Sequence, residues 1–308
     1  MVDTDVCAPP LRELLERPRG RRRLVREGSG WGALYLPAPG EAAPRPDRAL
    51  RLVAMTSFTV GRAALRAMAH YQRRHPDAVS LVGVVTDDPL DPAARIGRRK
   101  RAWKYLSEEG AAALHCSTLE AGLTAGAPVF TGEIKAPWFR RLLEEWRPDA
   151  LVCCCLGQVI DRTIVEAADV GAYNLHPSDL GRGHGAGFAP HEDAFARQAF
   201  TARWTLHRIT DVLDGGPVVG VSPPVYIRDA FGSLPATPLA YYERMNAALP
   251  GLARQLLDAL VARHRLGLRR PLEELRFSAA TPLALLAELL RPLRGPEERQ
   301  IAGGRQPS

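Results

Sequence analysis

The chain has 308 residues, a hydrophobic share of 46% and a formal net charge of +7. This length and composition allow a sizeable buried core and exclude a wholly disordered chain, and no apolar run reaches the roughly 18 residues of a membrane-spanning helix. The N-terminus lacks the basic and apolar regions of a secretory signal, so we expect a cytoplasmic protein without a membrane partner.

The first 48 residues differ in character from those that follow. Residues 1–48 are rich in proline, glycine and arginine and show no sustained periodicity, which predicts an irregular basic N-terminal arm. From residue 49 the pattern becomes regular. It predicts buried strands at 50–55 and 79–86, with a helix at 62–73 between them.

The alternation of strand and helix continues through the middle of the chain. The pattern predicts a short strand at 128–130, a helix at 138–146, a strand at 150–156, a helix at 162–168 and a strand at 171–176. The strand at 150–156 is uniformly apolar, as strands buried on both faces of a parallel sheet are. We therefore expect an α/β fold with a doubly wound, mostly parallel sheet.

The C-terminal third is predicted to be mainly helical. Two short strands at 217–221 and 223–227 precede helical spacing over 238–265, which Pro250 interrupts, and a further helix at 282–290.

These patterns divide the chain into three predicted parts. The first is the arm at 1–48, the second a catalytic domain at 49–230, and the third a helical C-terminal extension at 231–308 that ends in a disordered tail.

The five cysteines show neither a disulfide framework nor a zinc motif. Three are adjacent at Cys153–Cys155, and no pair has the C-x-x-C spacing. We expect these three to act as small apolar residues of a buried strand. Neither His184 nor His191 has a carboxylate or cysteine at a spacing that completes a metal site, so no metal is predicted.

Positive charge is concentrated in two runs, Arg17–Arg23 and Arg98–Arg101. Such runs attract phosphates or RNA, but solvated surface segments often have the same composition. The sequence therefore leaves a tRNA partner open without favouring one.

Two separated motifs carry the candidate chemistry. Asn174 and His176 lie two residues apart at the end of a predicted strand, so their side chains should point to one face, at the edge of the sheet where ligands bind. Asp214 lies far downstream, before two glycines. An amide for an oxyanion, a histidine for protons and a carboxylate to tune that histidine suit acyl transfer. We expect Asp214 to raise the pKa of His176 by favouring the imidazolium.

The motifs N-x-H-P-S at 174–178 and T-x-H-x(6)-D-G-G-P at 205–217 resemble the signature of the folate-dependent formyltransferases. That superfamily includes glycinamide ribonucleotide, methionyl-tRNA and sugar formyltransferases and formyltetrahydrofolate hydrolase. The resemblance covers about residues 50–227. It implies a Rossmann-like formyltransferase sheet and an enzyme that moves a formyl group from 10-formyltetrahydrofolate, as co-substrate, to an amine. Asn174, His176 and Asp214 match the family's catalytic Asn, His and Asp.

The resemblance also implies a folate pocket in which backbone groups bind the pterin edge and apolar side chains cover its faces. The matching positions flank the apolar strand and Asp214: Leu156, Gly157, Gln158, Val159, Ile160, Asp211 and Leu213. His207, in the T-x-H motif, is expected to have a structural role.

The acceptor of the formyl group is not defined by the sequence. The segment Gly181–Gly187 departs from the family's Leu-Leu-Pro pattern in a loop that borders the acceptor. Candidate acceptors are a nucleotide-linked amino sugar, glycinamide ribonucleotide or another small amine. Alternatives are methionyl-tRNA formylation without the usual C-terminal barrel, hydrolysis of formyltetrahydrofolate, and non-catalytic folate binding. The oligomeric state stays undefined. No G-x-G-x-x-G motif follows the first strand, which argues against a dinucleotide dehydrogenase.

Overall fold

A computed structural model describes residues 23–26, 32–38, 40, 42, 46–87 and 107–278 of the chain. Several predictions therefore concern residues outside the described part: the basic run Arg98–Arg101, most of the run Arg17–Arg23, the helix at 282–290 and the C-terminal tail.

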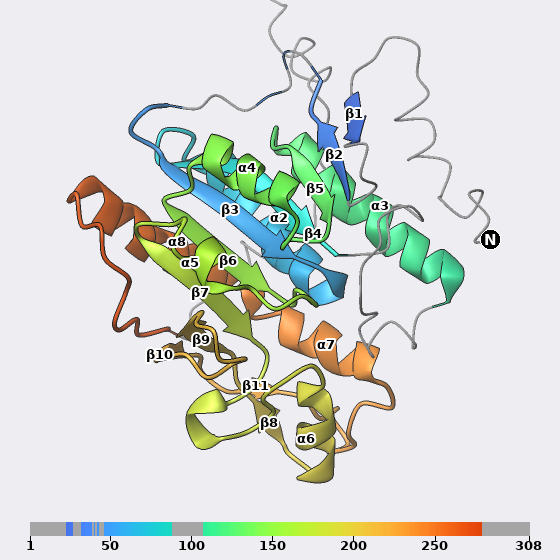
Figure 1. Cartoon of the computed structure of the whole chain (residues 1–308). Helices are drawn as coiled ribbons and strands as arrows, with labels where there is room; N and C mark the ends of the chain where they lie inside the picture. Colours follow the sequence, from blue (N-terminus) through green and yellow to red (C-terminus); the bar gives the residue numbers. More distant parts are fainter. Residues whose placement is uncertain are drawn as a thin grey trace, which may run out of the picture.

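A nine-stranded sheet forms the centre of the molecule, in the order β1-β2-β5-β4-β3-β6-β7-β9-β10 (Figure 1). Its strands in chain order are β1 (Arg23–Arg26), β2 (Gly32–Leu36), β3 (Leu50–Thr56), β4 (Val79–Thr86), β5 (Val129–Gly132), β6 (Ala150–Cys154), β7 (Gly171–His176), β9 (Thr205–Arg208) and β10 (Val218–Val221). Strands β3 to β7 pair in parallel, whereas β2 and β9 pair antiparallel with their parallel neighbours. The predicted doubly wound, mostly parallel α/β sheet is confirmed.

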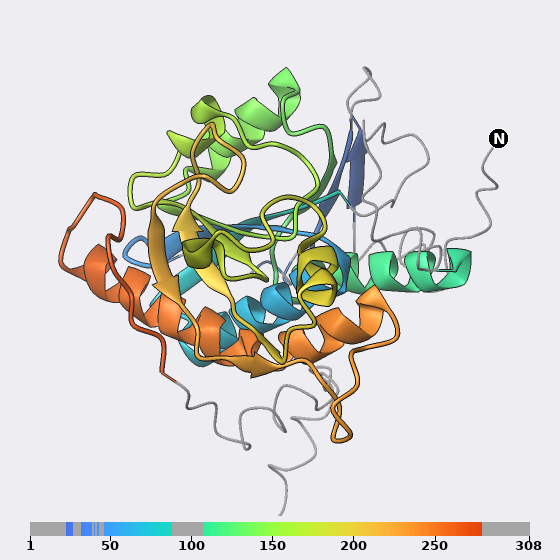
Figure 2. The same ribbon diagram turned by 90° about the horizontal axis from the view of Figure 1, so that it is seen from below.

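Helices cover both faces of this sheet (Figure 2). One hydrophobic cluster lies between the sheet and α2 (Phe58–Arg74), α3 (Glu108–Thr124), α7 (Pro238–Asn246) and α8 (Leu249–Arg265). A second lies between the opposite face and α4 (Pro137–Trp146) and α5 (Arg162–Val165). Strands β3 and β4 are buried along almost their whole length, because both of their faces are covered. This burial accounts for their mostly apolar sequences.

Local signals in the sequence explain where several helices begin. The Asp161 carboxylate accepts a hydrogen bond from the N–H of Ile164 and begins α5, and the Thr237 hydroxyl accepts from Ala240 and begins α7. Pro250, predicted to interrupt one long helix, lies in the first turn of α8, where proline is tolerated. Helix α3 was not predicted, because its alanine- and glycine-rich sequence gives little contrast between its faces.

Both ends of the described chain pack against the central sheet. Strand β2, within the predicted arm, pairs with β5, and helices α7 and α8 of the predicted extension pack on α2. The two boundaries between the three predicted parts stay predictions. None of the described helices is long and apolar enough to cross a bilayer.

The direction of the strand order changes at β3, and this position determines where a ligand can enter. From β3 the chain adds β4 and β5 on one side and β6 and β7 on the other. The loops after β3 and β6 therefore diverge, which opens a crevice at the carboxyl ends of the strands.

The contact between Gly83 of β4 and Trp146 of α4 predicts a stability effect. A Cβ on Gly83 would lie 2.4 Å from the Trp146 ring, so Gly83→Ala should lower the free energy of unfolding by about 1–3 kcal/mol through overpacking. Gly181→Ala is the control, because its nearest atom would lie at 3.7 Å. Urea unfolding measures both, and equal effects of the two variants would contradict this packing.

Candidate active site

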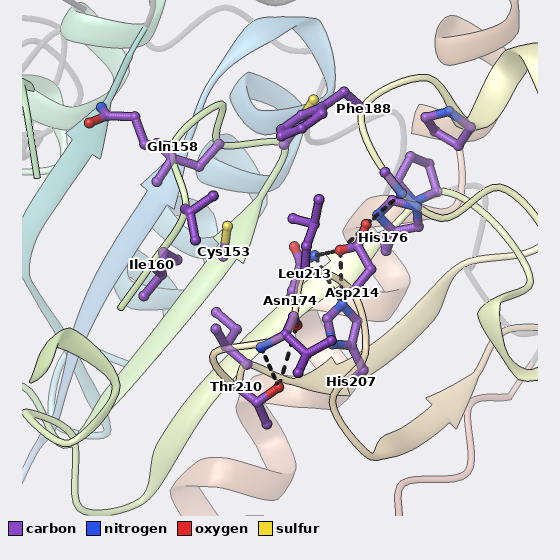
Figure 3. A pocket seen from close by; sticks show the side chains of 18 of the residues that line it. Cys153, Gln158, Ile160, Asn174, His176, Phe188, His207, Thr210, Leu213 and Asp214 are labelled. Atoms are coloured by element: carbon purple, nitrogen blue, oxygen red, sulfur yellow. Dashed lines mark hydrogen bonds and ion pairs between the residues drawn. The ribbon is translucent and has the colours of Figure 1, made fainter. Parts of the chain in front are cut away.

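Strand β7 carries Asn174 and His176 at its carboxyl end (Figure 3). Both side chains line the same pocket, which agrees with their two-residue spacing. Strand β9 runs antiparallel beside β7 and pairs His207 with Asn174. Directly opposite residues point to the same face of a sheet, and Nδ2 of Asn174 lies 3.0 Å from Nε2 of His207.

Asp214 reaches the site from the segment between β9 and β10, with a backbone φ of +51°. Its Oδ1 lies 3.6 Å from Nδ1 of His176 and 3.4 Å from Nδ2 of Asn174. The same oxygen lies 3.6 Å from Nε2 of His207, and Oδ2 accepts a 2.8 Å hydrogen bond from the N–H of Gly187. The structure therefore brings together the three residues that the sequence motifs singled out.

The two ring nitrogens of His176 have different neighbours. Nε2 lies 2.8 Å from the carbonyl oxygen of Gly185, which can only accept, so we assign the hydrogen to Nε2. The hydroxyl of Ser178 donates to the same carbonyl at 3.1 Å. In the neutral ring, Nδ1 is then the nitrogen without hydrogen, and it is the one that faces Asp214.

The same reasoning assigns the hydrogen of His207. Its Nδ1 lies 3.0 Å from the carbonyl oxygen of Arg208 and therefore donates. Its Nε2 accepts from Asn174, which directs the NH2 group of that amide toward His207 and Asp214. The sequence predicted a structural role for His207, and the structure places this residue in the pocket wall, in contact with Asn174 and Asp214. The T-x-H spacing was the available signal, but only the pairing of β7 with β9 shows which residue His207 faces.

Burial and charge act on the protonation of the site in opposite directions. Burial lowers the pKa of His176, and the nearby Asp214 carboxylate and Gly185 carbonyl do not compensate for it. Asp214 acts in the predicted direction and favours a higher pKa of His176, but desolvation of the imidazolium outweighs this attraction, so the net shift is downward. Burial alone would raise the pKa of Asp214, but contacts with His207, His176 and the Gly187 N–H bring it below its ordinary value. A neutral imidazole thus lies beside an ionised carboxylate.

The pocket next to these residues contains about 850 Å³ of empty space, a part of which is open solvent. Five of the predicted folate-binding residues line it: Leu156, Gln158, Val159, Ile160 and Leu213. Gly157 and Asp211 are not among the lining residues; the N–H of Gly157 donates to the carboxylate of Asp87.

The side-chain amide of Gln158 stabilises the pocket wall from behind. Its Oε1 accepts from the N–H of Ile134 at 3.0 Å, and its Nε2 donates to the carbonyl of Gly132 at 2.8 Å. These bonds fix the loop after β6 against the segment that follows β5, so the side chain of Gln158 has a structural role in the wall (Figure 3).

The rim of the pocket is apolar. Val159 and Leu213 are 42% and 49% exposed, and Phe188, which sequence analysis did not single out, is 45% exposed. Exposed apolar side chains gathered around one opening are typical of a ligand site. Among the residues that the structure describes, no three His, Cys, Asp or Glu side chains come together in a way that could hold a metal ion.

Gly185 holds the loop after β7 close to His176. Its φ is +61°, and a Cβ at this position would lie 2.8 Å from Cβ of Ser178 and 3.2 Å from Pro190. The Thr205 hydroxyl donates to the carbonyl of Ser178 at 2.6 Å, and the Tyr241 hydroxyl donates to the carbonyl of Pro177 at 3.0 Å. The loop is therefore joined both to β9 and to α7. The unusual glycines of this loop are visible in the sequence, but the close packing of Gly185 is not.

Comparison with known proteins gives a consistent result. A family model described as formyl transferase matches residues 59–235. The methionyl-tRNA formyltransferase of Anaplasma marginale (strain St. Maries) is 30% identical over 122 residues, 39% of this chain and 38% of that protein. The methionyl-tRNA formyltransferase of Syntrophus aciditrophicus (strain SB) is 40% identical over 53 residues, 17% of each chain. The chain thus matches well under half the length of these relatives.

Glycinamide ribonucleotide transformylase 1 from Symbiobacterium toebii shares the fold, with a TM-score of 0.51 at 16% identity over 72% of this chain and 93% of that one.

The close approach at Gly185 predicts a stability effect with an internal control. Gly185→Ala should lower the free energy of unfolding by about 1–3 kcal/mol, because it adds a steric clash to the strain of a positive φ. Gly183 has a φ of +73° with no atom within 4 Å of a Cβ, so Gly183→Ala carries the backbone strain alone. Urea unfolding of both should give the larger loss for Gly185→Ala. Equal losses would show that the contact with Ser178 is unimportant.

The lowered pKa of His176 predicts a pH dependence of stability. As pH falls below about 6.5, the unfolded chain takes up a proton at this residue that the folded protein resists. The contribution of His176 to stability is therefore complete above pH 6.5 and decreases below it, by at most about 1.4 kcal/mol per pH unit for one proton. Urea unfolding at several values from pH 7.5 to 5.5 should show a steeper fall for the unmodified protein than for His176→Gln. Parallel curves would contradict the assignment.

Proposed function

The chain belongs to the formyl transferase family, and from this premise we propose that it transfers a formyl group from 10-formyltetrahydrofolate to an amine, with Asn174, His176 and Asp214 as catalytic residues. The observation that carries the proposal is the arrangement of an amide N–H and a neutral imidazole, each within 3.6 Å of one ionised carboxylate, beside an apolar pocket.

The attack of the amine creates the charge that the site must stabilise. The amine nitrogen forms a bond to the formyl carbon, and the formyl oxygen becomes an oxyanion. The NH2 group of Asn174 supports this step, because its contact with Asp214 at 3.4 Å is weak and can be exchanged for a stronger bond to the oxyanion. The bond to His207 at 3.0 Å keeps the amide in the required orientation during this exchange.

The attacking amine must also lose a proton. Nδ1 of His176 and Oδ1 of Asp214 face each other at 3.6 Å, and neither atom carries a hydrogen at neutral pH. A proton released by the amine is stabilised between them. When the bond between the formyl carbon and the folate nitrogen breaks, the pair returns the proton to that nitrogen. The proposal thus gives His176 the role of a proton acceptor in the resting enzyme, because its lowered pKa keeps it neutral.

The proposed folate subsite is the apolar part of the pocket. Leu156, Val159 and Ile160 from the loop after β6, with Leu213 on the segment before Asp214, supply apolar surface for a flat ring system. The loop after β7, which includes Gly187 and Phe188, borders the same space and is the proposed acceptor side.

Methionyl-tRNA is a second candidate acceptor, because the matched relatives are named methionyl-tRNA formyltransferases. The main test measures release of tetrahydrofolate from 10-formyltetrahydrofolate by absorbance, with a panel of small amines, with methionyl-tRNA, or with no acceptor. Release that depends on one acceptor identifies the substrate. Release without any acceptor indicates hydrolysis, and folate binding without release indicates a non-catalytic protein.

Asp214→Asn should lower kcat by at least about 100-fold, because the variant lacks the charge that receives the proton. Its free energy of unfolding should change little, since the Asn amide oxygen can still accept from Gly187. Glu192→Gln is the control, because Glu192 is exposed on α6 (Pro190–Ala196) and does not line the pocket. Steady-state kinetics and urea unfolding measure both variants. A fully active Asp214→Asn protein would refute the proposed roles.

A further inference from the structure

The loop after β6 is bound to the ends of three neighbouring strands, one after another. In the sheet these strands follow β6 in the order β3, β4 and β5. Ser57, directly after β3, donates to the carbonyls of the two residues at which β6 ends and the loop begins. The N–H of Gly157 then donates to Asp87, directly after β4, and the side chain of Gln158 bonds to the end of β5 and the segment that follows it. The loop therefore runs across the carboxyl edge of the sheet and is held at each strand that it passes.

Asp87 makes the central one of these contacts from a buried position. It is 1% exposed, and its Oδ2 lies 2.5 Å from the amide nitrogen of Gly157. Burial of a carboxylate is unfavourable unless hydrogen bonds replace those to water, so the native position of Asp87 depends on donors such as this N–H. A hydrogen bond to a charged acceptor is also stronger than one between neutral groups. Asp87 thus fixes the backbone of a loop that lies 70 positions away in sequence.

The contact divides the backbone donors of the loop into two groups. Gly157 is not among the residues that line the pocket, whereas Leu156 before it and Gln158, Val159 and Ile160 after it are. Within the described part of the chain, the backbone N–H groups of Gln158, Val159 and Ile160 donate no hydrogen bond. A ligand can therefore accept from these groups, while the N–H of Gly157 is already bound inside the protein.

We propose that Asp87 is a positioning residue for the folate: its hydrogen bond to Gly157 holds the loop after β6 in the conformation that presents the backbone and apolar side chains of this loop to the ring. Asp87 does not line the pocket, so it takes no part in proton transfer. Its removal should weaken contacts that the bound substrate and the transition state share, which raises KM and leaves kcat unchanged. This kinetic effect rests on the function proposed above, whereas the effect on the loop does not.

Two substitutions of Asp87 test this role in the full chain. Asp87→Ala removes the acceptor, and Asp87→Asn keeps an acceptor oxygen in a side chain of similar size without the charge. The second variant also serves should the alanine variant fold poorly. Asp77→Asn is the control, because Asp77 is exposed in the turn before the same strand β4 and does not line the pocket.

Steady-state kinetics of formyl transfer give the first measurement. The KM for 10-formyltetrahydrofolate should rise at least about tenfold in Asp87→Ala and by a smaller factor in Asp87→Asn, in line with the loss or weakening of one charged hydrogen bond. The kcat should stay within about twofold of the unmodified value, and the KM for the acceptor should not change. Asp77→Asn should match the unmodified protein in all three constants.

Amide hydrogen exchange tests the bond without any reaction. Fragmentation mass spectrometry of the exchanged protein should show the Gly157 amide exchanging at least about ten times faster in Asp87→Ala than in the unmodified protein or in Asp77→Asn. Urea unfolding of the same variants measures their global stability. Exchange that is faster at Gly157 but unchanged in β3 and β4 assigns the effect to the loop.

Two outcomes would overturn the proposal while leaving formyl transfer intact: unchanged exchange at Gly157 in both Asp87 variants, or a lower kcat with an unchanged KM for 10-formyltetrahydrofolate. If the unmodified protein transfers no formyl group, the proposed reaction fails. Calorimetric binding of 5-formyltetrahydrofolate, a stable analogue, then decides: weaker binding by Asp87→Ala supports the positioning role, and equal binding rejects it. An unmodified protein that binds no folate rejects both proposals.

Discussion

The antiparallel pairing of β7 with β9 is the constraint on which the site depends. It places His207 opposite Asn174, and it begins the segment that returns Asp214 to the same face of the sheet. A shift of this register by one residue would turn His207 to the opposite face and remove the hydrogen bond that orients the amide. The parallel strands on the other side of β7 contribute the pocket wall, but they do not orient any of these polar groups.

Burial determines the protonation of the site as much as charge does. His176 and His207 are each less than 10% exposed, and Asp214 lies between their rings. In water such a carboxylate would favour an imidazolium, but desolvation makes the neutral ring of His176 the more stable form. The ionised Asp214 is stabilised instead by several weaker contacts, of which the N–H of Gly187 is the shortest. In the resting site, neither Nδ1 of His176 nor Oδ1 of Asp214 therefore carries a hydrogen, and this pair of atoms can accept one proton.

The sequence predicted the features that depend on local pattern and missed those that depend on pairing. The buried parallel strands and the shared face of Asn174 and His176 follow from periodicity alone. Helix α3 was missed because alanine and glycine give no contrast between faces. The contact of His207 with Asn174 was not predicted, because it exists only through the pairing of β7 with β9. The net lowering of the pKa of His176 was not predicted, because the burial of this residue cannot be read from the motif.

The unusual loop after β7 and the motif residues form one unit. The carbonyl of Gly185 accepts from both His176 and Ser178, and the N–H of Gly187 donates to Asp214. The loop thus supplies an acceptor to the imidazole and a donor to the carboxylate, so its backbone geometry determines which atom of each group faces the substrate. A loop that both orients the polar groups and borders the proposed acceptor side cannot change freely to suit a new acceptor. Variation in acceptor specificity is therefore expected at side chains such as Phe188, which lines the pocket without making one of these hydrogen bonds.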